Sequence, residues 1–82
     1  MDIQSIETFL QVASLENYTR AAEKLNFAQS TVTMQIQRLE QELGYPLFER
    51  IGRRNYLTAA GKTFLPHAAE ILRLMQKVSG LG

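Results

Sequence analysis

The chain of 82 residues has no cysteine and only one histidine, His67. Without cysteine there is neither a disulfide framework nor a thiolate metal site, and one histidine cannot build a multi-histidine metal cage. One histidine and scattered carboxylates also do not supply a nucleophile, a base and an orienting group, so an enzyme is not expected. We expect no metal and no cofactor in this domain.

Long apolar runs are missing as well. No stretch approaches the length of a membrane span, and the N-terminus lacks a basic-then-apolar signal pattern. The expected protein therefore has no membrane partner and is cytoplasmic. Hydrophobic residues nevertheless make up 45% of the chain, which is typical of one folded domain with a modest core.

An excess of one sign of charge is missing over the whole chain, because nine Lys and Arg residues balance eight Asp and Glu residues and the net charge is only +1. Its distribution is more informative than its total. Between residues 50 and 69 the chain carries Arg50, Arg53, Arg54 and Lys62 and no acidic residue. The basic charge is local, and a local basic segment is compatible with a nucleic-acid contact.

Residues 28–43 form the most informative stretch and are predicted to be a helix. Apolar residues recur there at spacings of four, three and four, which defines one buried stripe: Val32, Ile36, Leu39 and Leu43. A second face is short, largely uncharged and rich in hydrogen-bonding groups: Gln29, Ser30, Thr33, Met34 and Gln37. Such a face suits base edges in a DNA major groove, although an ordinary polar surface would look the same.

Two helices are predicted before this stretch. The first runs from an Asp2 cap to about Leu15, and the second covers residues 20–25 behind a Thr19 cap. The connection at residues 26–28 is too short for a free loop, which is typical of a helix-turn-helix. The third helix is expected to end at Gly44, before Pro46.

A β-hairpin and a last helix are predicted after Gly44. Residues 47–50 and 55–58 are expected to be strands around a turn at 51–54, with Arg53 and Arg54 at the tip. Thr58 is the expected cap of the last helix. That helix carries a heptad stripe and a neighbouring leucine, which we interpret as a dimer interface: Phe64, Ala68, Ile71, Leu72, Met75 and Val78.

The expected fold is mostly α, a winged helix-turn-helix with three helices and a two-stranded wing. A long linker or dimerisation helix follows it, so that the domains are residues 1–58 and 59–82. The predicted helix of residues 28–43 would be the recognition helix and would enter the major groove. The wing arginines would approach the minor groove or the backbone. The alternative is a helical protein-interaction module that works through its last helix.

Five sequence blocks in this order resemble the N-terminal DNA-binding domain of LysR-type bacterial transcriptional regulators. They are TRAA at 19–22, QSTVTMQIQRLE at 29–40, LG at 43–44, LFER at 47–50 and LTAAG at 57–61. The resemblance covers almost the whole chain. It implies a homodimer on an imperfect palindrome, and a larger domain, absent from this chain, that binds a small-molecule effector of unknown identity.

The resemblance also assigns roles to single residues. By position, the residues implied to read bases are Gln29, Ser30, Thr33, Met34 and, in the wing, Arg53. Residues expected at the DNA backbone are Thr31, Gln35, Arg38 and, from its place at the hairpin tip, Arg54.

Two residues depart from the family pattern. Ala28 stands where serine is usual, and losing that helix cap typically costs about 1 kcal/mol. Met34 stands where a basic residue is frequent, and it can pack on a thymine methyl but cannot pair with a phosphate. We therefore expect an altered base preference and fewer ionic contacts at that position.

Overall fold

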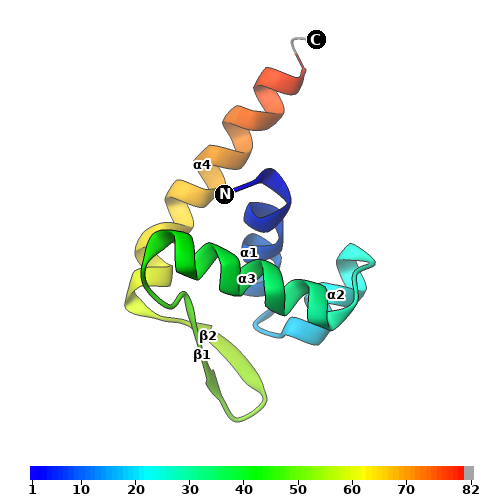
Figure 1. The fold of residues 1–82 in the computed structure, drawn as a ribbon, viewed down its shortest axis with the longest axis vertical. Helices are drawn as coiled ribbons and strands as arrows, with labels where there is room; N and C mark the ends of the chain where they lie inside the picture. The colour runs from blue at the N-terminus through cyan, green and yellow to red at the C-terminus, as the bar shows by residue number, and fades with distance from the viewer. Residues whose placement is uncertain (81–82) are drawn as a thin grey trace.

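The computed structural model describes residues 1–80, in which three helices, a hairpin and a long helix follow one another (Figure 1). The elements are α1 (Ile3–Leu15), α2 (Tyr18–Leu25), α3 (Gln29–Leu43), β1 (Phe48–Ile51), β2 (Arg54–Leu57) and α4 (Ala59–Ser79). The predicted winged helix-turn-helix with a long last helix is confirmed. The end of the predicted linker helix, residues 81–82, lies outside the described residues.

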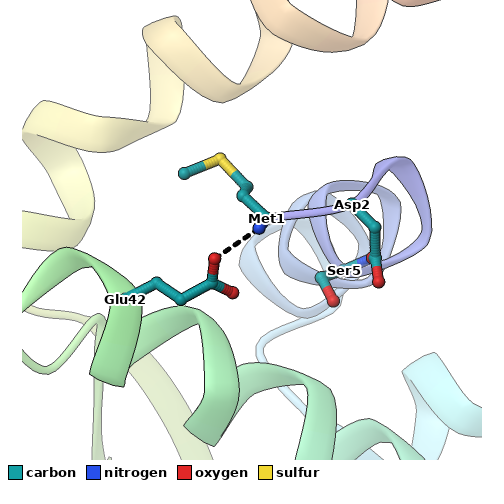
Figure 2. Close-up of polar contacts among 4 residues, drawn as sticks. All are labelled: Met1, Asp2, Ser5 and Glu42. Carbon is teal, nitrogen blue, oxygen red and sulfur yellow. Dashed lines mark hydrogen bonds and ion pairs between the residues drawn. The ribbon is translucent and has the colours of Figure 1, made fainter.

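Helix caps account for most of the element boundaries. The Asp2 carboxylate accepts the N–H of Ser5 at 2.7 Å, and the hydrogen bonds from Ser5 lower the pKa of Asp2 below its ordinary 3.8. Figure 2 shows Asp2 and Ser5 beside a second contact, in which the amino group of Met1 pairs with the Glu42 carboxylate near the end of α3. The start of α1 is thereby joined to the end of α3.

The predicted cap of the second helix is wrong by two residues. Asn17, not Thr19, precedes α2, and its side-chain oxygen accepts the N–H of Arg20 at 2.9 Å. Asparagine is among the strongest N-cap residues, so the helix begins at Tyr18 and Thr19 lies inside its first turn.

All four helices contribute side chains to a single core. The Phe9 ring lies at its centre, with ring centroids 5.4 Å from Phe48 and 5.1 Å from Phe64. The buried apolar residues are Ile6, Phe9, Val12, Ala21, Ala22, Val32, Ile36, Leu39, Leu47, Phe48, Phe64 and Ala68. The first half of α4 is therefore fixed against α1, while its second half extends away from the body (Figure 1).

This packing corrects two of the predicted dimer residues. Phe64 and Ala68 are buried within their own chain, so their side chains do not lie on an outer surface. The N-terminal part of the predicted stripe therefore packs on α1 of the same chain.

The wing is an antiparallel hairpin, and its first strand begins at the buried core residue Phe48. Ile51 pairs with Arg54, so the loop consists of Gly52 and Arg53, and Gly52 adopts the left-handed conformation that glycine favours, with φ +63°. Each strand lies one residue from its predicted position. No helix within residues 1–80 is both long and apolar enough to cross a membrane.

Candidate nucleic-acid interface

The polar face of α3 is held outward by the buried face opposite. Val32, Ile36 and Leu39 are fully buried, whereas Gln29, Ser30 and Met34 are exposed. Two further predicted contact residues, Thr31 and Thr33, are half-buried, while Arg38 is exposed. Within residues 1–80 no side chain caps α3 at Ala28, as expected for an alanine there.

Gln35 is a correction to the predicted backbone contacts. Its side chain is buried, accepts the Thr8 hydroxyl at 2.5 Å and donates to the Gln4 side chain at 3.3 Å. Because these bonds join α1 to the inner face of α3, Gln35 is a structural residue that does not reach a phosphate.

The wing is anchored to the loop between α1 and α2. The Asn55 N–H donates to the Glu16 carbonyl at 2.9 Å, and the Asn55 side chain accepts the Tyr18 N–H at 3.3 Å. The Arg54 guanidinium lies 3.4 Å from the Glu16 carboxylate. Arg54 thus has a partner within the fold, whereas Arg53 occupies the exposed tip.

A cleft of about 540 Å³ opens between the start of α2, the start of α3 and the wing. We call it the wing cleft; its lining is Asn17, Tyr18, Thr19, Gln29, Thr33, Phe48, Arg50, Arg53 and Asn55. Three predicted base-reading residues, Gln29, Thr33 and Arg53, therefore border one concave surface. Ser30 and Met34 lie outside this lining, on the exposed part of α3.

Tyr18 forms part of the apolar side of the wing cleft. Its ring packs edge-on against Phe48, with centroids 6.0 Å apart. Burial, and secondarily the negative charge of Glu40, raises the pKa of the Tyr18 phenol to about 12. The phenol is therefore neutral at physiological pH.

Two residues that line the wing cleft make polar contacts that the sequence does not predict. Thr19 donates its hydroxyl proton to the side-chain oxygen of Gln29 at 3.0 Å, and Asn55 joins the wing to the helices. Neither contact has a local sequence signal, because each links residues that are distant along the chain.

The second half of α4 carries the remaining predicted dimer residues. Ile71 and Leu72 are half-buried, and Met75 and Val78 are exposed. Leu74, which is 45% exposed, was missed, although Ile71, Leu74, Met75 and Val78 follow the helical spacing i, i+3, i+4, i+7. The last three of these line an apolar groove of about 350 Å³ together with Ile3 and Ser79.

A recognition helix with a polar outer face, beside a wing with an arginine at its tip, defines the winged helix-turn-helix class of DNA-binding domain. Residues 3–62 match the family model described as "Bacterial regulatory helix-turn-helix protein, lysR family". The chain belongs to this LysR family.

Curated relatives agree with the family model. The chain is 48% identical over 77 residues to the HTH-type transcriptional regulator YwqM of Bacillus subtilis, covering 94% of this chain and 26% of that protein. It is 48% identical over 75 residues to YfiE of Escherichia coli, covering 92% and 26%. The chain thus spans about a quarter of these relatives, which are named as transcriptional regulators and not as enzymes.

Solved structures show the same fold in complex with DNA. The DNA-binding domain of CbnR, solved with DNA, matches with a TM-score of 0.92 at 39% identity over 98% of this chain and 92% of that one. The BenM DNA-binding domain on its benA site 1 matches with a TM-score of 0.89 at 33% identity over 99% and 94%. These likenesses favour DNA binding over a protein-interaction module.

Proposed function

We propose that this chain binds double-stranded DNA sequence-specifically, as the DNA-reading domain of a LysR-type transcriptional regulator. The observation that carries the proposal is the wing cleft, where Gln29 and Thr33 of α3 and Arg53 of the wing share one concave surface. A helix in the major groove would place the wing tip over the adjacent minor groove or backbone.

Each part of this surface has a distinct role in the proposal. Gln29, Ser30, Thr33 and Met34 contact base edges in the major groove, and Arg53 enters the minor groove, where a guanidinium follows the concentrated negative potential. Contacts to the DNA backbone come from Thr31, Arg38 and Arg54, whose pairing with Glu16 leaves further guanidinium donors for a phosphate.

We further propose that two copies associate through the second half of α4. Exposed Leu74, Met75 and Val78, with half-buried Ile71 and Leu72, would be covered by the same surface of a second chain. Two-fold symmetry would then separate the recognition helices by about 34 Å or a multiple of it, so the operator would be an imperfect palindrome.

The dimer is tested by sedimentation of two variants that each add one negative charge to α4. Leu74→Glu should yield monomers, because it places a carboxylate on the apolar groove. Gln76→Glu adds the same charge at another exposed position and should remain dimeric. A dimeric Leu74→Glu variant would refute this interface.

For the whole protein, we propose that residues 1–58 form the DNA-binding unit and residues 59–82 the linker helix. A further domain would bind a small-molecule effector, whose chemistry is not encoded in these residues. A regulator of bacterial transcription acts on the nucleoid, so its proposed location is the cytoplasm.

The direct test is selection of bound sequences from a random DNA pool at moderate salt. We expect an enriched imperfect palindrome with the wild-type chain and loss of that enrichment with Arg53→Ala and Gln29→Ala combined. Lys77→Ala, which removes an exposed charge from the far end of α4, is the control and should enrich the same palindrome. Sequence-blind binding by the wild-type chain would refute the proposal.

A further inference from the structure

Gln29 opens α3 and is exposed at the end of the helix that would contact base edges. A glutamine amide has a carbonyl oxygen that accepts and an NH₂ group that donates. Rotation by half a turn exchanges the two, so an unrestrained amide matches a base acceptor and a base donor equally well. A single hydrogen bond from Gln29 therefore discriminates between bases better when the amide is held in one orientation.

The Thr19 hydroxyl contacts this amide. It lies in the first turn of α2 and donates to Oε1 of Gln29 at 3.0 Å. Within residues 1–80 the Nε2 of Gln29 donates to no other group. Both residues line the wing cleft, so the contact is made at the surface proposed for DNA and not in the core.

The scaffold holds both partners of this bond in place. Asn17 caps α2 at the turn that carries Thr19, and Ala21 and Ala22 of the same helix are buried. Val32, one turn after Gln29, fixes the start of α3 in the core. The hydroxyl and the amide therefore meet before DNA arrives, which reduces the entropy lost when the side chain is ordered on binding.

We propose that Thr19 is a positioning residue that sets base specificity through Gln29. In the observed contact the hydroxyl occupies Oε1, which leaves the Nε2–H donors of Gln29 for the DNA. Gln29 then reads an acceptor in the major groove, which guanine, adenine and thymine each present and cytosine does not. The inference rests on the proposed function, because it requires α3 to lie in the major groove.

The experiment measures competition binding of the 82-residue chain to operator duplexes carrying each of the four base pairs at one position. That position is the one at which Gln29→Ala flattens the preference of the selected operator. We expect the wild type to disfavour cytosine there. Thr19→Val should reduce that discrimination roughly 3- to 10-fold, the range for one net hydrogen bond, with unchanged thermal unfolding.

Two matched variants accompany Thr19→Val. Thr19→Ser keeps the hydroxyl and should keep the discrimination. Thr63→Val removes an exposed threonine hydroxyl from α4, where it donates to the Ala59 carbonyl, and should leave the base preference unchanged. In a double-mutant cycle, Thr19→Val should add nothing to the loss of discrimination caused by Gln29→Ala.

Other results would overturn the inference. Full discrimination by Thr19→Val would show that the hydroxyl does not orient Gln29. Equal weakening on all four duplexes would make Thr19 a phosphate contact, and a wild-type preference for cytosine would mean that Oε1 faces the DNA. In these cases the selected operator still supports the proposed function, whereas a wild type that selects no sequence would refute both.

Discussion

Replacing Gly61 by alanine tests how closely the start of α4 approaches the base of the wing. A Cβ at position 61 would lie 2.3 Å from the Leu47 carbonyl oxygen and 2.9 Å from Cδ2 of Leu57. The leucine side chain can rotate, but the carbonyl accepts the Thr58 N–H at 3.0 Å and is fixed. Overpacking of this kind costs about 1–3 kcal/mol. Because the clash is with a fixed carbonyl, we expect the upper part of this range, about 2–3 kcal/mol. The better helix propensity of alanine offsets about 1 kcal/mol, so the expected net loss is about 1–2 kcal/mol.

The assay is urea unfolding at one fixed protein concentration, because association would otherwise shift the midpoint. Gly80→Ala is the matched control, since its Cβ would lie 3.5 Å from the nearest carbonyl oxygens, an ordinary contact distance. We expect that variant to unfold within about 0.5 kcal/mol of the wild type. If Gly61→Ala equals or exceeds the wild type in stability, the close approach does not constrain the fold.

Three further predictions concern individual side chains. Gln35→Ala leaves the buried Thr8 hydroxyl without its partner and should lower the free energy of unfolding by about 1–3 kcal/mol. The affinity of the folded variant for generic DNA should not change, and a weaker affinity would restore Gln35 as a backbone contact. Met34→Arg should raise generic DNA affinity and steepen the log–log salt dependence by about 0.9, whereas an unchanged slope would mean that residue 34 points away from phosphates. The Tyr18 phenol has a folded-state pKa of about 12 against an ordinary 10.0, so it stabilises the fold below pH 10 and this contribution is lost as pH rises from 10 to 12. Subtracting the absorbance titration of Tyr18→Phe from that of the wild type should reveal an ionisation near pH 12, and one near pH 10 would contradict the burial.

Where the signals are local, the sequence predicts this fold well. The apolar stripe of α3, the stop at Gly44 and the Thr58 cap depend on neighbours within one or two turns, and all three are present in the structure. The prediction of the α2 cap was wrong because Asn17 and Thr19 are both good capping residues and lie two positions apart. Only the backbone conformation distinguishes them, and Asn17 has the extended one.

Gln35 shows that the chemical type of a residue can mask its position. Val32, Gln35, Ile36 and Leu39 follow the spacing of a buried face, so the sequence did contain the signal. The residue type of Gln35 favours the opposite placement, because glutamine is usually exposed. Its burial depends on Thr8, which lies 27 residues earlier. The hydrogen bond from Thr8 compensates for the loss of hydrogen bonds to water when the Gln35 amide is buried.

The stripe on α4 illustrates a different limit. Periodicity predicts that a helix face is buried. It does not predict whether the residues that pack on this face belong to the same chain or to another copy. Phe64 and Ala68 face α1, and only the part of α4 beyond the body leaves Leu74, Met75 and Val78 exposed. Burial within the chain depends on where α1 ends relative to α4, which no local pattern encodes.

The Leu47 N–H donates to the Glu40 carboxylate at 2.7 Å, which joins the residue before β1 to the last turn of α3. Rotation of α3 about its axis would therefore carry the root of the hairpin with it. Operators read by this domain should keep a constant number of base pairs between the segment under α3 and the segment under Arg53. Substitutions of the contacting side chains can change the bases that are recognised. A change in the number of base pairs between the two segments requires a different connection between α3 and the hairpin.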